Sequence, residues 1–259
     1  MKTRLDKLLV DRGLTPSRER AQALILAGKV LVNEQKIEKA GASIDSGSAL
    51  RLLGEDLRYV SRGGLKLEKA LEHWRIDLHG KVCLDIGAST GGFSDCMLQH
   101  GAARVIAVDT GYGQMDFGLR TDARMRLLEK TNARYLKPGD IGEPVDFIAM
   151  DVSFISATLV LPAVIRTASA CASGTRIPTP GPIEIVVLVK PQFEAGRELV
   201  GKGGIVRDES AQRAAVARVE AALAELGCVR AEWIESPILG GEGNREFLLH
   251  AEFSPPAVQ

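Results

Sequence analysis

Residues 81–101 read KVCLDIGASTGGFSDCMLQHG, and this stretch decides the fold of most of the chain. The apolar run at 81–87 ends in a glycine, as a buried strand often does. Glycines and small polar residues follow at 87–92, and residues 91–101 look like the next helix. Strand, glycine-rich turn and helix in this order predict the first unit of an α/β domain.

The alternation continues to the end of the chain. Further strands are expected at 103–111, 124–133, 145–154 and 183–193, with two closing strands at 229–237 and 245–253. Helices are expected at 157–173 and 209–226, the second with Ala214, Ala217, Ala221 and Leu226 in its apolar stripe. Strands and helices of these lengths predict a doubly wound, Rossmann-like, mostly parallel sheet.

Ser89 lies in a turn that has two incompatible interpretations. The turn fits G-x-S-x-G, which presents the nucleophilic serine of an α/β-hydrolase, and His250 follows in the chain order of such a triad. The oxyanion loop of a hydrolase must come from an earlier strand of the same sheet, however, and within the α/β part of the chain only the strand at 81–87 precedes Ser89. His250 also falls in the middle of an expected strand. Both observations disfavour a hydrolase.

A cofactor cradle fits the position of the loop better, because ligands bind α/β sheets at the carboxyl edge. Asp109 ends the second strand, 22 positions after Gly87, where a carboxylate accepts hydrogen bonds from ribose hydroxyls. The loop reads G-A-S-T-G-G rather than G-x-G-x-x-G, which favours a single nucleoside such as S-adenosylmethionine (AdoMet) over a dinucleotide. Asn132 can hydrogen-bond an adenine edge or cap a helix or turn. The expected cofactor-binding residues are Gly87, Ala88, Ser89, Thr90, Gly91, Gly92, Phe93, Asp109 and Asn132.

Four charged residues are expected near the same edge. Asp151 and Lys190 end the fourth and fifth strands, and Lys66 stands at the start of a helix before the first strand. If the last strand is antiparallel, its beginning reaches this edge, and Glu246 stands at that beginning. Two lysines and two carboxylates can then converge. The alternative for each residue taken alone is an ordinary surface charge or ion pair.

Residues 1–60 form a smaller module. They hold 11 basic and 8 acidic residues, whereas the rest of the chain holds 22 basic and 25 acidic. Helices are expected at 4–13 and 15–29, with Pro16 at a first helical position, followed by a hairpin at 29–37 and a strand at 48–53. The small basic excess hints at a surface for nucleic acid. We therefore expect an accessory α+β domain at 1–60 and the α/β domain at 61–259.

The motifs match a known family in fixed order. RLDKLLVDRGLTPSRERAQALILAGKVLVNEQKI resembles the S-four (S4) RNA-binding domain. Residues 59–253 resemble the TlyA family, haemolysin-like proteins that pair an S4 domain with an FtsJ-like RNA methyltransferase domain. That likeness rests on VSRGGLKL, GASTGGF, AVDTGYGQ, EKTNAR, DVSFIS, VKPQFE and GNREF.

The resemblance implies an AdoMet-dependent ribose 2'-O-methyltransferase that acts on RNA, above all ribosomal RNA. It implies a K-D-K-E tetrad at Lys66, Asp151, Lys190 and Glu246, and AdoMet binding by the 87–92 loop and Asp109. It also implies that the second helix and the turn after it face RNA. The expected phosphate contacts are Arg18, Arg20, Lys29, Arg62 and Lys202, with Arg207 in the same loop as Lys202.

The chemistry of this tetrad is consistent with methyl transfer. A ribose hydroxyl is a poor nucleophile and needs a base, and lysine becomes one when desolvation or a neighbouring cation lowers its pKa. We expect Lys190 to be the base and Lys66 the neighbouring charge, with the two acids orienting lysines and ribose. The methyl donor brings its own leaving group, so no metal is expected. Phe154 and Phe193 can line the pocket, stack on a base or pack in the core.

Composition argues against several further classes of protein. The four cysteines lie far apart with no CxxC pair, which argues against a zinc site or disulfide framework and suits a reducing cytoplasm. The first twenty residues are too charged for a secretory signal, and the most apolar run, at 185–189, is too short to cross a bilayer. Two alternatives remain: an RNA-binding assembly protein without turnover, and a haemolysin-like membrane-active protein.

Overall fold

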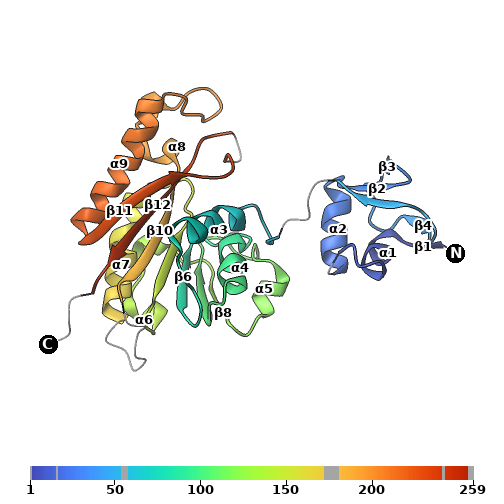
Figure 1. Cartoon of the computed structure of the whole chain (residues 1–259), viewed down its shortest axis with the longest axis horizontal. Helices are drawn as coiled ribbons and strands as arrows, with labels where there is room; N and C mark the ends of the chain where they lie inside the picture. The colour runs from blue at the N-terminus through green and yellow to red at the C-terminus, as the bar shows by residue number, and fades with distance from the viewer. Residues whose placement is uncertain (1, 16, 54–57, 172–180, 241–242, 256–259) are drawn as a thin grey trace. The chain divides into compact units, whose positions relative to one another are not determined.

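The structure is a computed structural model that describes residues 2–15, 17–53, 58–171, 181–240 and 243–255. The chain divides into two compact units, Met1–Leu57 and Arg58–Gln259 (Figure 1). Pro16, and the last two residues of the helix expected at 157–173, lie outside the described residues.

The larger unit is built on one sheet. Within the described residues it has seven strands in the order β11-β12-β10-β9-β6-β7-β8. Their bounds are β6 Val82–Ile86, β7 Arg104–Val108, β8 Met125–Leu128, β9 Phe147–Met150, β10 Ile183–Val189, β11 Cys228–Glu235 and β12 Phe247–Phe253. The strands from β10 through β8 are parallel to their neighbours, and β12 is antiparallel to both β10 and β11. The predicted doubly wound sheet is confirmed, and the last strand is antiparallel, which is the condition on which the placement of Glu246 depended.

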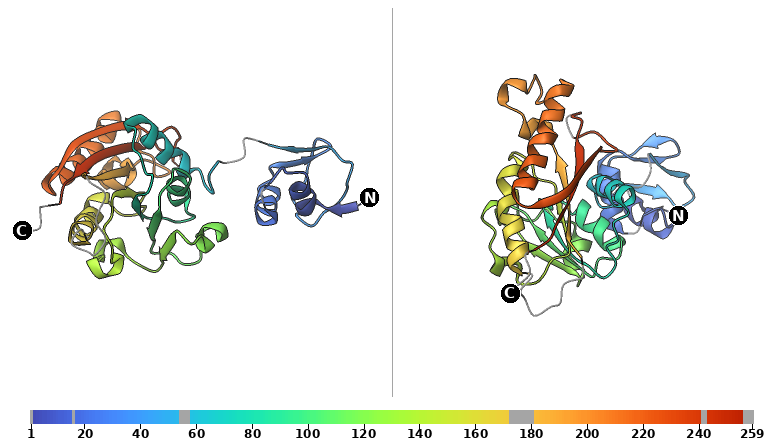
Figure 2. Two further views of the ribbon diagram at one scale, coloured as in Figure 1. Left: turned by 60° about the horizontal axis from the view of Figure 1, so that its bottom comes forward. Right: turned by 60° about the vertical axis from the view of Figure 1, so that its left-hand side comes forward.

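Helices cover both faces of this sheet (Figure 2). One face carries α3 (Gly63–Trp74), α4 (Gly92–Gln99) and α5 (Phe117–Thr121), and the other carries α6 (Pro138–Ile141), α7 (Ala157–Cys171) and α9 (Glu209–Glu225). Side chains of β6 alternate between them: Leu84 and Ile86 pack into the core with α7 and α9, and Cys83 packs with α3 and α4. The strand is apolar along almost its whole length because both of its faces are buried.

Strand direction brings the ends of distant segments together. The carboxyl ends of β6, β7, β9 and β10 reach one edge of the sheet because these strands are parallel. In the antiparallel pair, Phe247 at the start of β12 faces Val189 at the end of β10. The residues next to them, Glu246 and Lys190, therefore arrive at the same edge.

The buried face of α9 differs from the expected stripe. Ala214, Ala217 and Ala221 are exposed, and Leu226 is only partly buried. The buried residues are Ala211, Gln212, Ala215, Val216, Val219 and Leu223. The expectation was wrong because alanine occurs on every side of this helix, so the larger valine and leucine side chains decide which face packs.

The smaller unit is an α+β domain. Its described helices are α1 (Leu5–Asp11) and α2 (Arg18–Leu26), and its strands are β1 (Lys2–Arg4), β2 (Val30–Val32), β3 (Gln35–Lys36), β4 (Ser43–Asp45) and β5 (Leu50–Leu52). Leu5, Leu9 and Ile25 are fully buried in its core. The β2–β3 turn has positive φ at Asn33 and Glu34, as tight hairpin turns require. The predicted helices and hairpin are thus present.

Candidate active site

The loop between β6 and α4 starts with a residue that must be glycine. Gly87 has a φ of +86°, and a Cβ there would stand 2.3 Å from the carbonyl oxygen of Asp151. Any side chain would push the end of β6 away from the end of β9, its neighbour in the sheet. Glycine therefore keeps the loop pressed against Asp151.

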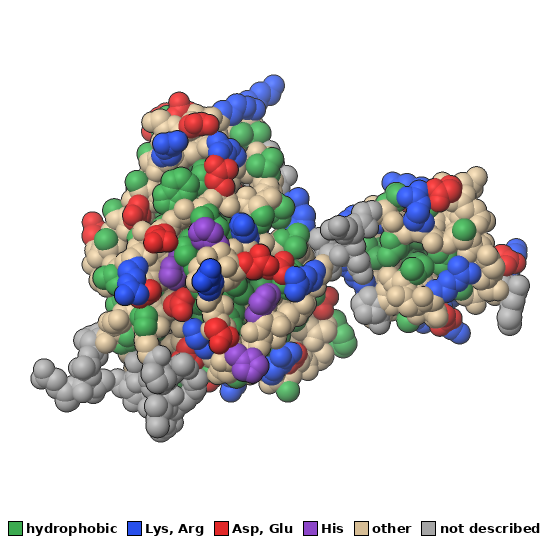
Figure 3. Space-filling view, viewed as in Figure 1, with side chains coloured by type: hydrophobic (Ala, Val, Ile, Leu, Met, Phe, Trp, Pro, Cys, Tyr) green, Lys and Arg blue, Asp and Glu red, His purple; other side chains and the backbone are tan. Residues whose placement is uncertain are grey.

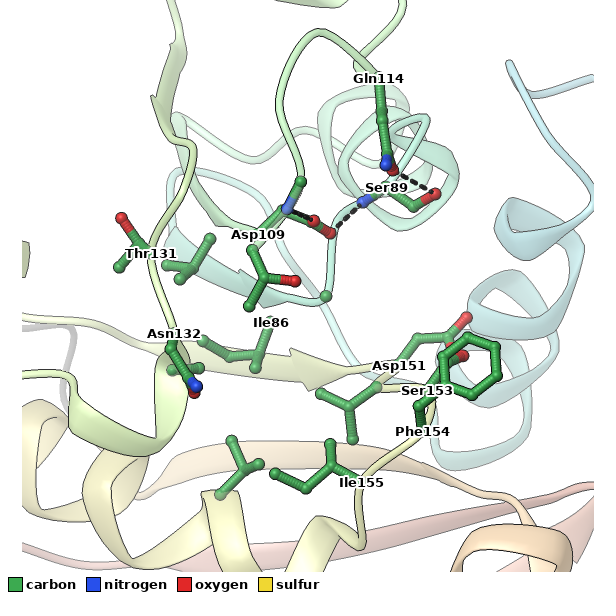
Figure 4. A pocket seen from close by; sticks show the side chains of 17 residues that line it. Ile86, Ser89, Asp109, Gln114, Thr131, Asn132, Asp151, Ser153, Phe154 and Ile155 are labelled. Atoms are coloured by element: carbon green, nitrogen blue, oxygen red, sulfur yellow. Dashed lines mark hydrogen bonds between the residues drawn. The ribbon is translucent and has the colours of Figure 1, made fainter.

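Asp109, which follows β7, connects two loops at this edge (Figure 4). Its Oδ2 accepts a hydrogen bond from the Ser89 backbone N–H (2.8 Å), and its Oδ1 accepts one from the Gly111 N–H (2.6 Å). A carboxylate has about four acceptor positions, so Asp109 can also accept hydrogen bonds from ribose hydroxyls.

A cavity of ≈530 Å³ lies beside Asp109. Ile86, Val108 and Ile155 give it an apolar part, and Asp109 and Asn132 give it polar groups (Figure 4). Its volume falls within the range of small-molecule sites. Apolar surface for a purine, with a carboxylate beside it for ribose hydroxyls, fits the nucleoside part of AdoMet.

Asn132 has the capping role, one of the two roles that the sequence leaves open. Its Oδ1 accepts a hydrogen bond from the Arg134 N–H (3.0 Å) and so caps the short 3₁₀ helix η1 (Ala133–Tyr135). Asn132 also lines the cavity. Its amide nitrogen is the group that can serve a ligand.

The glycine-rich loop borders a second cavity of ≈240 Å³ on its other side. Ser61, Arg62, Lys66 and Asp151 also line this smaller cavity. Of the loop residues expected to bind the cofactor, Gly87 and Ser89 line both cavities, and Ala88, Thr90, Gly92 and Phe93 line the smaller one. Gly91 lines neither and is the N-cap of α4, with a φ of +96°. The loop forms the wall between the two cavities.

Within the part of the chain that the structure describes, the Ser89 hydroxyl has no hydrogen bond to a histidine, the base that a hydrolase nucleophile needs. Its hydroxyl lies 3.5 Å from Gln114 Oε1. His250 stands in the middle of β12 opposite Val186, where its Nε2 lies 3.3 Å from Glu184 and its ring stacks on Trp74. The histidine is thus part of a separate cluster, and the hydrolase interpretation has no triad.

The four charged residues form two lysine–carboxylate pairs. Lys66 Nζ lies 2.5 Å from Glu246 Oε2, with side chains only 11% and 3% exposed. Lys190 Nζ lies 2.5 Å from Asp151 Oδ1, with side chains 11% and 21% exposed. Lys66 and Asp151 both line the smaller cavity, so members of the two pairs meet there. Buried lysines are held in fixed positions by such pairing, which suits groups that must meet a substrate.

Ser153 is a polar contact that the sequence analysis did not single out. Lys190 Nζ donates a hydrogen bond to Ser153 Oγ (2.8 Å), two residues beyond Asp151. Ser153 and Phe154 also line the larger cavity. The motif DVSFIS contains both residues, but nothing in a single sequence indicates which of its side chains reach the lysine.

Asp85 is a second residue that the sequence analysis missed. It lies inside β6, is fully buried, and accepts a hydrogen bond from Ser94 Oγ at the start of α4 (2.5 Å). Burial raises the pKa of the Asp85 carboxyl to about 7, and Asp151 and Asp109 add to the rise. An aspartate within the apolar run VCLDI is the sequence signal that could have found it.

The expected RNA-contacting residues are divided between the two units. In the smaller unit, Arg18 is exposed, and Arg20 and Lys29 are partly exposed. In the larger unit, Arg62 is exposed at the rim of the smaller cavity, and Lys202 is exposed in the loop before α9. All five are accessible to some degree, as phosphate contacts require.

The smaller unit also holds an arginine cluster built on a buried acid. Asp6, fully buried, accepts hydrogen bonds from Arg4 Nε (3.0 Å) and Nη2 (2.8 Å), from Arg18 Nη2 (3.0 Å) and from Gln22 Nε2 (2.8 Å). The hydrogen bond from Arg4 is the main cause that holds the pKa of Asp6 well below its usual range. Asp6 thereby fixes two half-exposed guanidinium groups side by side.

The visible face of the larger unit mixes acidic and basic side chains rather than gathering one sign (Figure 3). Among the described residues, no group of three or more His, Cys, Asp or Glu side chains is placed to hold a metal ion. In that same part of the chain, no helix is both long and apolar enough to cross a membrane.

Comparison with known proteins assigns both units to known families. Residues 59–253 match the family described as FtsJ-like methyltransferase, and residues 3–50 match the S4 domain. The chain is 49% identical over 251 residues to the "Putative rRNA methyltransferase YqxC" of Bacillus subtilis, covering 96% of this chain and 85% of that protein. It is 43% identical over 249 residues to the 16S/23S rRNA (cytidine-2'-O)-methyltransferase TlyA of Mycobacterium tuberculosis, covering 96% and 89%.

A solved structure covers almost the whole chain. "Putative hemolysin from Streptococcus thermophilus" aligns with a TM-score of 0.71 at 44% sequence identity, covering 98% of this chain and 89% of that one. The matched segments include the glycine-rich loop and all four charged residues of the site. The chain therefore belongs to the TlyA family, in which an S4 domain precedes an FtsJ-like, AdoMet-dependent methyltransferase domain.

Proposed function

We propose that this protein transfers a methyl group from AdoMet to a ribose 2'-hydroxyl of ribosomal RNA. The convergence of two lysine–carboxylate pairs beside a nucleoside-sized cavity carries the proposal. The relative from Mycobacterium tuberculosis is named for 2'-O-methylation of cytidine in 16S and 23S rRNA, which supports the same class of substrate here.

The larger cavity would hold the nucleoside part of AdoMet. Asp109 would accept hydrogen bonds from its ribose hydroxyls, Asn132 would contact the adenine edge, and residues 87–93 would lie along the rest of the cofactor. When bound, AdoMet supplies an electrophilic methyl group on a positively charged sulfur. The smaller cavity, lined by Lys66, lies across the loop and would receive the substrate ribose.

Lys190, as the neutral amine, would take the proton of the 2'-hydroxyl as that oxygen attacks the methyl group, and Asp151 would stabilise the ammonium that forms. Asp151 and Ser153 hold the Lys190 amine from two sides, at 2.5 and 2.8 Å, and so fix its direction. Lys66, held by Glu246, would contribute positive charge beside the ribose. These roles need no metal ion because the methyl donor carries its own leaving group.

Phe154 is suited to hold the target base. Its side chain is 91% exposed, although its backbone has a φ of +63°, an unfavourable conformation for an aromatic residue. Its ring lies beside that of Phe193, with 5.4 Å between the ring centroids. Its exposure excludes simple core packing, and a base stacked on it would lie next to Ser153 and Lys190.

Methyl transfer from labelled AdoMet to ribosomal RNA, followed by mapping of the modified ribose, tests the function. Lys190→Ala should abolish transfer and leave AdoMet affinity unchanged, because Lys190 is not part of the wall of the larger cavity that would hold the nucleoside. Turnover by the alanine variant would remove Lys190 from the role of base.

Two other functions predict different experimental results. An RNA-binding assembly protein would bind AdoMet and RNA without transfer. A membrane-active protein would release dye from liposomes in the absence of RNA.

A further inference from the structure

Glu194 is a buried carboxylate next to the site that the proposed chemistry does not use. It ends α8 (Pro191–Glu194), the short helix that begins directly after Lys190, and it is 4% exposed. Its Oε2 accepts a hydrogen bond from Ser156 Oγ (2.5 Å), and its Oε1 accepts one from the Ala157 N–H (2.7 Å). Both partners belong to the segment that follows Asp151.

The contacts of Glu194 continue into the start of α7. The Ser156 hydroxyl also accepts a hydrogen bond from the Thr158 N–H (3.2 Å), so Ser156 caps the helix and Glu194 holds the cap. The first N–H groups of a helix lack partners within it, and a negative charge there is favoured by the helix dipole. A carboxylate from another segment satisfies both requirements at once. Burial nevertheless raises the pKa of Glu194.

Two segments are thereby joined at both of their ends. Residues 151–157 carry Asp151 and Ser153, and residues 190–194 carry Lys190. At one end Lys190 contacts Asp151 and Ser153, and at the other Glu194 contacts Ser156 and Ala157. Between them lie the rings of Phe154 and Phe193.

The short helix α8 keeps the spacing between the two joints constant. The Phe193 N–H donates to the Lys190 carbonyl (2.9 Å), and the Ala195 N–H donates to the Pro191 carbonyl (2.8 Å). Arg218 of α9 supports this helix from the other direction, because its Nη1 donates to the Glu194 carbonyl oxygen (3.0 Å). A displacement of Glu194 would therefore also displace Lys190.

We propose that Glu194 is a positioning residue for methyl transfer: it anchors the start of α7 to the end of α8 and so keeps Asp151 and Ser153 in register with the Lys190 amine. This inference rests on the proposed function. A purely structural role for Glu194 would change stability alone, whereas a positioning role changes turnover at a given stability.

The test compares Glu194→Ala, Glu194→Gln and a matched control, Thr167→Val. Thr167 is buried further along α7, and its hydroxyl donates to the Leu136 carbonyl (3.1 Å), so its loss also removes a buried hydrogen bond from this helix. Thr167 lies ten residues from Ala157, about 15 Å along the helix and away from Lys190. The measurements are kcat and KM for ribosomal RNA, the pH profile of kcat, AdoMet affinity and thermal unfolding.

Glu194→Ala should lower kcat about 10- to 100-fold, the size of effect expected when reacting groups move by a fraction of an ångström to an ångström. Its KM for RNA and its AdoMet affinity should change much less, and its pH profile should shift because the surroundings of Lys190 change. Glu194→Gln should recover most of the turnover, since its amide oxygen can accept from Ala157 and its NH₂ can donate to Ser156. Thr167→Val should lower the unfolding temperature and leave kcat and the pH profile as in the wild type.

Equal kcat values for Glu194→Ala and Thr167→Val would overturn the positioning role while leaving the methyltransferase function intact. Absence of turnover in the wild type would instead sink the proposed function, and the role of Glu194 with it. If Glu194→Ala does not fold, Ser156→Ala replaces it, because that change removes one of the two hydrogen bonds. A kcat of Ser156→Ala equal to that of the wild type would then overturn the proposal.

Discussion

Asp85 is a buried carboxyl inside an otherwise apolar strand. The strand β6 is buried on both faces, yet one of its side chains towards α3 and α4 is a carboxyl, to which the Ser94 hydroxyl donates a hydrogen bond from the start of α4. A charge in such a place is unfavourable, so the carboxyl holds its proton up to about pH 7, the value to which burial raises its pKa. Over a range of pH below about 7, the Asp85 carboxyl is therefore protonated in the folded protein and ionised in the unfolded chain.

This difference predicts a pH-dependent stability. The pKa of Asp85 is about 7 in the folded protein, against 3.8 for an ordinary aspartate side chain, so wild-type stability should fall as the pH rises between these values. Asp85→Asn cannot titrate, and its free energy of unfolding relative to wild type should rise by roughly 4 kcal/mol across this interval. Urea unfolding between about pH 4 and pH 7 measures it. Ser94→Ala keeps the carboxyl and should retain the wild-type direction, and a pH-independent difference for Asp85→Asn would contradict the prediction.

Gly87 gives a second prediction with a matched control. Gly87→Ala combines a positive φ with a Cβ 2.3 Å from the Asp151 carbonyl oxygen, whereas Gly80→Ala has a positive φ and nothing within 4 Å. Gly80→Ala should cost about 1 kcal/mol of stability, and Gly87→Ala clearly more, because the ends of β6 and β9 must separate. Calorimetric titration should find AdoMet binding weakened at least tenfold in Gly87→Ala only. Equal effects of the two changes would show that the close approach is unimportant.

At the scale of elements, the site depends on a contact between α3 and β12. Lys66 on α3 and Glu246 before β12 are 180 positions apart in the chain and form a buried pair. Removing one partner leaves the other as an unpaired buried charge, which costs about 3–5 kcal/mol.

The pair predicts a non-additive mutant cycle. Lys66→Met and Glu246→Gln should each destabilise the protein, and the double variant should be less destabilised than the sum of the two by at least about 1 kcal/mol. Unfolding in urea measures all four proteins. Additive changes would mean that the two groups do not interact in solution. Methyl transfer should be lost in all three variants.

Most elements of the larger unit could be predicted because their signals are local. The apolar run before Gly87 and the residues around Asp109 each indicate a strand and its end within ten positions. Glu246 could be placed only conditionally, since strand direction depends on pairing between residues far apart in the chain. The buried face of α9 was mispredicted because alanine gives no preference for a side.

Side-chain partners were the least predictable part of the site. That Lys190 contacts Ser153 as well as Asp151, and that Glu194 caps α7, follow from how two loops pack together. The hydrophobic periodicity of a sequence does not predict such contacts. The partners of Asp6 were equally hard to predict, because its two arginines come from different elements of the smaller unit.

At the scale of the whole molecule, the two units match two different families, and we propose that one binds RNA while the other carries out the chemistry. The S4 domain spans residues 3–50 and the methyltransferase domain residues 59–253. If the first unit grips RNA through phosphates, its contribution should depend on salt and leave the AdoMet site unaffected.

Charge reversal tests this division. Arg18→Glu with Arg20→Glu should weaken RNA binding at moderate salt and reduce the slope of log affinity against log salt by roughly one per lost phosphate contact. AdoMet affinity should stay the same. The control reverses two exposed arginines of the other unit, Arg213 on α9 and Arg230 on β11, which changes net charge equally. Equal losses of RNA affinity in the two double variants would argue against RNA binding by the S4 domain.

The direction of β12 has a practical consequence. Because the strand leaves Glu246 at the edge of the two lysine–carboxylate pairs and runs antiparallel to β10, Phe253 emerges at the opposite rim of the sheet, opposite Ile183. A fluorophore or affinity handle attached beyond that point would start on the far side from the reacting groups. Immobilising the protein through a handle at this rim should leave the edge that carries the two lysine–carboxylate pairs facing away from the support.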